Sequence, residues 1–165
     1  GLVSSSDTYF TVPARAFEIN RELALGGEEM TPEILDREFA RKGTLSVNKA
    51  GVVWPWVGDV CRVAMEAFGI FANVNLYATR EGAAVAVPPH NDRQDVFILQ
   101  LEGRKRWTMY LPLVPLPRYE QVRGKSRTGE VPSEELGVPT HDVVLDPGDV
   151  LYVPRGYLHA TSTVV

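Results

Sequence analysis

Residues 142–163 read DVVLDPGDVLYVPRGYLHATST, and this stretch decides the expected fold. Residues 146–149, Asp-Pro-Gly-Asp, are a turn signal between two short apolar runs that we expect to be strands. Pro154 would end the second run, because proline has a fixed φ and no backbone donor. Gly156 permits the bend that swings the chain into a last strand, from which His159 would point into a barrel. The stretch therefore predicts antiparallel strands that deliver one histidine to the interior.

A second group of polar residues, His90-Asn91-Asp92, lies far upstream of that histidine. His90 and Asp92 would point the same way on an extended segment, because successive side chains of a strand alternate faces. Two imidazoles and one carboxylate form the facial triad that binds Fe(II) and leaves its opposite face open. We therefore predict that His90, Asp92 and His159 are metal ligands and catalytic residues. The simpler alternatives are a solvated His90 in a surface turn and a core His159 bonded to a backbone carbonyl.

The rest of the pattern predicts helices in the first part of the chain and strands in the second. Residues 31–33, Thr-Pro-Glu, are typical of a helix start. A second helix should end at Gly69. Its apolar stripe would consist of Trp56, Val60, Cys61, Ala64, Ala67 and Phe68. The expected helices cover residues 31–42 and 55–68, and the expected strands cover residues 73–79, 84–87, 95–101, 106–110, 142–145, 150–153 and 157–163.

The connections between these strands carry two further expectations. A Glu-Gly pair closes the strand over residues 95–101, so residues 106–110 should return as its hairpin partner. Residues 112–139 are rich in proline, glycine and charge, which predicts a long loop. The basic run over residues 123–127 would be a solvated face of that loop, and His141 would be solvated after it.

The composition is that of one ordinary globular domain, with 165 residues, 44% of them hydrophobic. We take residues 1–70 as its helical and loop cap and residues 71–165 as its β core. A net charge of −4 argues against nucleic-acid binding as the main function. The single Cys61 excludes an internal disulfide and is expected in the core. No apolar run reaches the length that a bilayer requires. The chain starts at Gly1 and ends soon after His159, so we expect it to be part of a longer protein.

Three segments carry a resemblance to a known family: Asn75-Leu76-Tyr77, residues 95–107 (DVFILQLEGRKRW) and residues 145–156 (LDPGDVLYVPRG). The spacing G-x5-P-x-G-x2-H that ends at His159 resembles the second motif of the cupin superfamily, and the H-x-D stands where cupins carry their first metal motif. Together the segments resemble JmjC-domain oxygenases of the cupin-4 branch, which includes ribosomal oxygenases and relatives described as histone demethylases.

The resemblance implies a mainly β fold, a double-stranded β-helix of the cupin or jelly-roll type with N-terminal helices, truncated at the C-terminus. It also implies Fe(II) and the cosubstrate 2-oxoglutarate. Lys105 matches the lysine that holds the distal carboxylate of 2-oxoglutarate, and Asn75 and Tyr77 match polar residues near the cosubstrate. The residues agree, because Lys105 would share a strand face with Trp107 and Met109, and a lysine in a partly apolar pocket needs an anionic partner. The alternatives are an exposed hairpin lysine and ordinary strand packing of Asn75 and Tyr77.

The function that the resemblance implies is an Fe(II)- and 2-oxoglutarate-dependent oxygenase that hydroxylates a protein side chain, first of all in a ribosomal protein. Demethylation of N-methyl lysine, as in a histone, is the second choice. The partners would be a protein or peptide substrate and O2, with no membrane and no direct nucleic-acid binding. The longer protein would be a homodimer inside the cell, in the nucleus or nucleolus of a eukaryote or the cytoplasm of a bacterium.

Two other functions stay open at this point. One is a metal-binding cupin without 2-oxoglutarate chemistry, against which Lys105 argues, because only the 2-oxoglutarate reaction needs a cation there. The other is a non-catalytic binding module, against which the intact triad argues. The chain also departs from the family pattern: Asn91 and Arg93 stand where family members often carry Tyr and Asp. Because position 91 should face away from the metal, we expect metal binding to survive this change.

Overall fold

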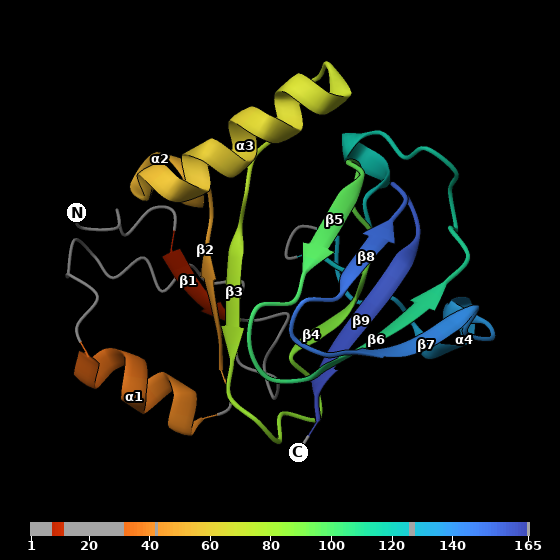
Figure 1. The fold of residues 1–165 in the computed structure, drawn as a ribbon. Coiled ribbons are helices and arrows are strands. Elements are labelled where there is room, and N and C mark those ends of the chain that lie inside the picture. Colours follow the sequence, from red (N-terminus) through yellow and green to blue (C-terminus); the bar gives the residue numbers. More distant parts are fainter. Residues whose placement is uncertain (1–7, 12–31, 42, 126–127, 165) are drawn as a thin grey trace.

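The computed structural model describes residues 8–11, 32–41, 43–125 and 128–164 (Figure 1). In chain order its elements are β1 (Thr8–Thr11), α1 (Pro32–Ala40), β2 (Thr44–Val47), α2 (Ala50–Val53), α3 (Pro55–Phe68), β3 (Leu76–Thr79), β4 (Val87–His90), β5 (Val96–Leu99), β6 (Lys105–Tyr110), the 3-10 helix η3 (Tyr119–Gln121), α4 (Ser133–Leu136), β7 (His141–Leu145), β8 (Val150–Val153) and β9 (Leu158–Thr163). No helix of the described part is long and apolar enough to cross a membrane.

The strands form three antiparallel sheets, in the orders β1-β2-β3, β4-β9-β6-β7 and β5-β8. The last strand, β9, lies between β4 and β6. The first and the last strand of this four-stranded sheet in chain order, β4 and β9, are therefore neighbours. Figure 1 shows the β5–β8 pair against that sheet, and the β1-β2-β3 sheet with α2 and α3 beside them. This arrangement confirms the prediction of a mainly β, jelly-roll type fold with N-terminal helices.

The hairpin that the sequence predicts between β5 and β6 is wrong. β5 pairs with β8, with Val96 opposite Val153, whereas β6 pairs with β7 and β9. The chain bends sharply after Leu99, because the side chain of Gln100 donates to two backbone carbonyls just ahead of it, at Glu102 and Gly103. This turn carries the chain from one sheet to the other. A sheet-crossing turn and a hairpin turn share the same local residue types, so the sequence did not separate them.

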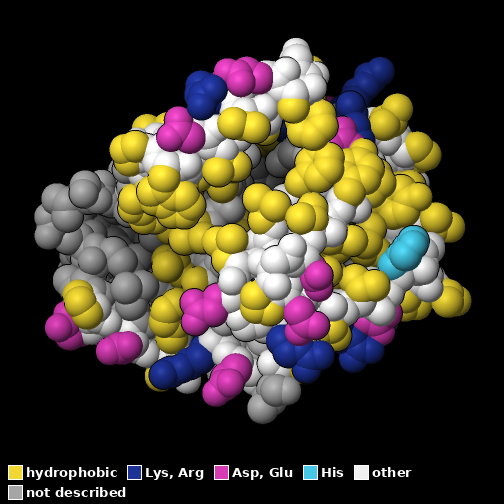
Figure 2. Space-filling view, viewed as in Figure 1, with side chains coloured by type: hydrophobic (Ala, Val, Ile, Leu, Met, Phe, Trp, Pro, Cys, Tyr) yellow, Lys and Arg dark blue, Asp and Glu magenta, His cyan; other side chains and the backbone are white. Residues whose placement is uncertain are grey.

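Helix α3 has the predicted bounds, and it ends because Gly69 adopts a left-handed φ of 67°. The predicted apolar stripe is buried only in part. The buried residues are Val57 and Cys61, whereas Trp56 is 63% exposed and Phe68 is also exposed. The burial of Cys61 confirms the prediction for that thiol. Phe68 stacks on Phe97 of β5, with ring centroids 5.3 Å apart, and Figure 2 shows hydrophobic side chains gathered on this face.

The remaining elements differ from expectation mostly at their ends. α1 lies within the predicted helix, whose capping Thr31 is outside the described residues. β3 begins at Leu76 and β4 at Val87, both later than predicted. β2, in the region predicted as helix and loop, pairs with β3 across the proposed boundary at residue 70. The division into a cap and a core stays a prediction.

Candidate metal centre

Neighbouring strands bring the two histidines of the predicted triad together. His90 ends β4 and lies opposite His159 of β9, so the two side chains leave the sheet side by side. Their ring centroids are 4.2 Å apart, and both residues are buried. The register of two strands therefore fixes the pair.

Each imidazole is oriented by its own backbone. Nδ1 of His90 lies 2.8 Å from the carbonyl oxygen of Pro88, and Nδ1 of His159 lies 3.1 Å from that of Tyr157. A carbonyl only accepts, so Nδ1 must donate and Nε2 keeps its lone pair. This is the arrangement in which the outer nitrogen of a histidine can ligate a metal.

The carboxylate of Asp92 completes the group, although Asp92 itself lies just beyond the end of β4. Its Oδ2 is 3.8 Å from Nε2 of His90 and 3.6 Å from Nε2 of His159. A hydrogen bond of 2.8 Å from the Gly156 amide to the Asp92 carbonyl ties this segment to the turn before β9. The three ligand atoms lie within 4.8 Å of one another, so small side-chain movements would bring them onto one first-row ion.

The ionisation states suit a divalent cation. Burial lowers the pKa of His90 and of His159, and the charge of Lys125 lowers that of His90 further. Burial alone would raise the pKa of Asp92, but the charges of Lys125 and of the two imidazoles outweigh it and lower that pKa to about 2. At neutral pH the site therefore presents one carboxylate and two neutral imidazoles, the forms that metal ions bind.

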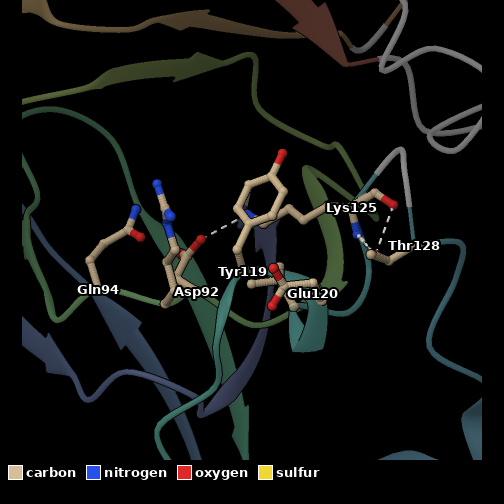
Figure 3. Close-up of a pocket in the computed structure, with 8 residues that line it drawn as sticks. Asp92, Gln94, Tyr119, Glu120, Lys125 and Thr128 are labelled. Carbon is tan, nitrogen blue, oxygen red and sulfur yellow. Dashed lines mark hydrogen bonds and ion pairs between the residues drawn. The ribbon is translucent and has the colours of Figure 1, made fainter.

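A basic residue that was expected on a solvated loop face lies in this site. Nζ of Lys125, from the loop between β6 and β7, is 2.9 Å from Oδ1 of Asp92. The prediction that residues 123–127 form a solvated loop face is therefore wrong at Lys125, while residues 126–127 lie outside the described part. Figure 3 shows the lysine and the carboxylate facing one another.

The loop reaches the site because the residue between the two ligands of the H-x-D anchors it. Asn91 is fully buried, and its Oδ1 accepts a 2.6 Å hydrogen bond from the Arg123 amide. Its own amide donates to the Arg123 carbonyl at 3.2 Å. Gly124 has a φ of +72°, and a Cβ there would lie 2.6 Å from Cα of His90 and nearer still to the Pro89 carbonyl oxygen. The glycine was the one signal in the sequence of a close backbone approach.

A pocket of about 540 Å3 opens beside Asp92 (Figure 3). The guanidinium of Arg93 lies 5.2 Å from the ring centroid of Tyr119, so one face of that ring is covered. The carboxylate of Asp92 and the ammonium of Lys125 both line this pocket, so the candidate metal centre is open to a ligand from this side. The lining residues are Asp92, Arg93, Gln94, Tyr119, Glu120, Val122, Lys125 and Thr128.

Lys105 occupies the interior face of β6, as predicted, with Trp107 and Met109 buried on the same face. Its Nζ donates to Oγ1 of Thr79 at 3.2 Å. Burial lowers the pKa of Lys105 to about 8. Within the described ranges, no carboxylate lies in ion-pair distance of this ammonium. The alternative of an exposed hairpin lysine is wrong.

Two further polar atoms near Lys105 are buried with no hydrogen-bond partner among the described residues: Nε1 of Trp107 and Oγ1 of Thr161. Trp107 and Thr161 are opposite one another on β6 and β9, and the Trp107 ring lies 5.8 Å from that of His159. Buried donors normally have partners, so these two atoms point to a polar ligand beside the triad. Thr161 belongs to no motif in the sequence, although it lies two residues after His159 on the same strand face.

The last two predicted site residues are placed differently from one another. Tyr77 lies two residues before Thr79 on β3, so its side chain leaves the face that contacts Lys105, and it is 47% exposed. Asn75 precedes the strand, and its Oδ1 accepts a hydrogen bond of 3.1 Å from the Lys49 amide in the turn after β2. The cosubstrate roles of both residues stay predictions.

Two imidazoles and a carboxylate clustered inside a jelly-roll barrel define the class as metal-binding cupins. The chain belongs to the JmjC domain family, whose model matches residues 58–164. It is 48% identical over 96 residues to ribosomal oxygenase 2 of Rattus norvegicus, covering 58% of this chain and 19% of that protein. It is 38% identical over 109 residues to the bifunctional lysine-specific demethylase and histidyl-hydroxylase NO66 of Drosophila willistoni, covering 66% of this chain and 14% of that protein.

Solved structures give the same fold. The X-ray structure of ycfD from Escherichia coli matches with a TM-score of 0.55 at 24% identity, covering 74% of this chain and 30% of that one. The ribosomal oxygenase YcfD in complex with cobalt and 2-oxoglutarate matches with a TM-score of 0.53 at 24% identity, over 74% and 28% of the two chains. The chain spans less than a fifth of the length of the curated relatives named above.

Proposed function

We propose that the protein is an Fe(II)- and 2-oxoglutarate-dependent oxygenase that acts on protein side chains. One observation carries the proposal: Nε2 of His90, Nε2 of His159 and Oδ2 of Asp92 converge in a buried site with the charges that a divalent ion requires. The ligand set fits Fe(II), because two nitrogens and one carboxylate oxygen leave half of an octahedron free for other ligands.

The polar side chains around Lys105 fit 2-oxoglutarate. Its distal carboxylate needs a cation, which the ammonium of Lys105 supplies together with the hydroxyl of Thr79. The unpartnered Nε1 of Trp107 and Oγ1 of Thr161 offer further hydrogen bonds between Lys105 and the metal ligands. The complex of YcfD with cobalt and 2-oxoglutarate supports this assignment in a protein of the same fold.

When bound, iron and cosubstrate supply the oxidising chemistry: the keto acid loses CO2 to give succinate, and one oxygen atom of O2 enters a substrate C–H bond. The protein binds, orients and shields. His90, Asp92 and His159 would hold the metal, Lys105 would fix the far end of the cosubstrate, and Tyr77 would lie on the same strand face as Thr79, the partner of Lys105. Asn75 could join them only by giving up its hydrogen bond to Lys49.

The substrate would be a side chain of another protein that enters through the pocket beside Asp92. Hydroxylation of a ribosomal protein residue is the first choice, supported by the name of the relative with 48% identity. Demethylation of N-methyl lysine is the second, supported by the name of the NO66 relatives. In that reaction, hydroxylation of a methyl group on nitrogen leads to its loss as formaldehyde.

The test is an anaerobic titration with Fe(II) and then with 2-oxoglutarate, followed by visible absorption. The chelate of a keto acid on Fe(II) has a weak charge-transfer band, which should appear at one equivalent of each. The variant His159→Ala serves as the control without a site. Iron binding with no band in the wild-type protein would favour a cupin with other chemistry, and the absence of iron binding would remove the oxygenase proposal.

A further inference from the structure

The two oxygens of the Asp92 carboxylate have different neighbours. Oδ2 faces the two imidazoles, at 3.8 Å from His90 and 3.6 Å from His159. Oδ1 lies 2.9 Å from Nζ of Lys125. The ammonium of Lys125 therefore contacts one oxygen of the carboxylate, and the other oxygen is the one nearer to the two imidazoles.

The position of Lys125 is fixed by its backbone. Its amide donates to Oγ1 of Thr128 at 3.1 Å, and the Thr128 amide and hydroxyl both donate to its carbonyl oxygen. Just before it, Gly124 packs on the His90 backbone, and Asn91 holds Arg123 by two hydrogen bonds. These contacts hold the backbone of Lys125 where its side chain reaches the carboxylate of Asp92.

A six-coordinate ion with three protein ligands keeps three positions, two for the keto acid and one for O2. A carboxylate that bound through both oxygens would take one of the three. A charged hydrogen bond to Oδ1 holds that oxygen away from the ion, because such bonds are about twice as strong as neutral ones. The number of positions left for reactants thus depends on the partner of Oδ1.

We propose that Lys125 is a positioning residue that keeps Asp92 a one-oxygen ligand, so that a full face of the metal stays open. This inference rests on the proposed function. The proposed role is more specific than a general contribution of charge or packing. Any cation in the loop could lower the pKa of Asp92, and any long side chain could fill the space of Lys125.

The experiment counts the water molecules on Mn(II) bound to the protein, by water-proton relaxation, without cosubstrate. The wild-type protein and Lys125→Arg, which keeps a charged donor, should show three waters. Lys125→Met, which keeps the length of the side chain, should show two. Arg123→Met is the matched control: it removes an exposed charge from the same loop but keeps the backbone contact to Asn91, and it should show three.

A second measurement is the affinity of the Mn(II)-loaded protein for 2-oxoglutarate. Lys125→Met should bind the cosubstrate about tenfold more weakly, because one coordination position must be freed first, and Lys125→Arg should recover most of that loss. Three waters in Lys125→Met would overturn the inference, as would two in Arg123→Met. Complete loss of Mn(II) from Lys125→Met would overturn it as well, since the lysine would then be needed for Asp92 to bind at all. Absence of Mn(II) from the wild-type protein would instead overturn the proposed function.

Discussion

His90 and His159 reach the candidate metal centre by strand pairing, whereas Lys125 reaches it through a loop. The histidines are opposite one another on adjacent strands, so the register of the sheet holds them. Lys125 depends on the contacts of Asn91, Gly124 and Thr128. This comparison indicates that the site has a rigid part, the strands that carry the histidine ligands, and a loop part around Lys125. The loop part is held by side-chain contacts and positions the Asp92 ligand.

Removal of a strand-borne ligand should have the largest effect. His159→Ala should weaken Mn(II) or Fe(II) binding by more than about 100-fold, because only two protein ligands remain. Calorimetric titration measures it, with the exposed His141→Ala as the matched control. An unchanged stoichiometry in His159→Ala would remove that residue from the ligand set.

Lys105, at the start of β6, is the second test of the residues that strands bring to the site. Lys105→Met should weaken 2-oxoglutarate binding roughly 10- to 100-fold, because a charge-assisted hydrogen bond is lost. Metal affinity should stay at the wild-type value, because Lys105 contacts Thr79 and none of the three ligands. Equal 2-oxoglutarate affinity in both proteins would show that another group holds the distal carboxylate.

The same lysine gives the wild-type protein a pH dependence. The pKa of Lys105 is lowered to about 8, so the free site loses its cation as the pH rises through that value. The affinity for 2-oxoglutarate should be level below pH 8 and fall about tenfold per unit above it. Titrations between pH 7 and pH 10 measure the profile. Lys105→Met should show no such bend, and a bend in that variant would assign the pH dependence to another group.

The loop part of the site is tested at Gly124, where the loop lies closest to the backbone of Pro89 and His90. Gly124→Ala should lower the free energy of unfolding by about 2 kcal/mol, because alanine is strained at a φ of +72° and its Cβ would overlap the backbone of Pro89 and His90. Denaturant unfolding measures it. Gly103→Ala is the control, since Gly103 also has a positive φ but no atom lies near its Cβ. An equal loss in both variants would mean that the backbone strain alone matters.

The metal-free protein should also lose stability in acid. The pKa of His90 and of His159 is lowered by burial, so the unfolded chain takes up protons below its ordinary pKa near 6.5 before the folded site does. Stability is therefore complete above pH 6.5 and falls as the pH drops below it, by up to about 1.4 kcal/mol per pH unit for each histidine. Unfolding at pH 7.5 and pH 5.5 measures the fall, and His159→Gln should reduce it. The same slope in His159→Gln would exclude that imidazole as its source.

Strand periodicity and turn residues predicted antiparallel strands after N-terminal helices, and the resemblance to JmjC-domain oxygenases implied the jelly-roll fold. Two spaced motifs predicted the triad. α3 was bounded correctly because Pro55 suits a first helical position and Gly69 a left-handed end. Its buried face was predicted only in part, because apolar residues occur on more than one side of the helix. Cys61 of the predicted stripe is buried, but so is Val57 outside the stripe, whereas Trp56 on the stripe is exposed.

The errors have one physical origin, which is contact between segments far apart in the chain. The partner of β5 is chosen by packing between two sheets, and its local turn is compatible with either partner. Lys125 resembles any solvated loop lysine until Asn91 brings the loop to the site. Asn75 fits the alternating pattern of a strand in the sequence, but its side chain accepts a hydrogen bond from the Lys49 amide in the turn after β2. The identity of the substrate, the homodimer and the intracellular location stay predictions.

The pairing of His90 with His159 also determines when the site exists. β9 must insert between β4 and β6, which closes a long stretch of chain, and such distant closures are the slow steps of folding. Before that docking, a metal ion meets His90 and Asp92 without the second imidazole. The colour of Co(II) bound by all three residues would therefore develop with the docking of β9 and would record the final step of folding.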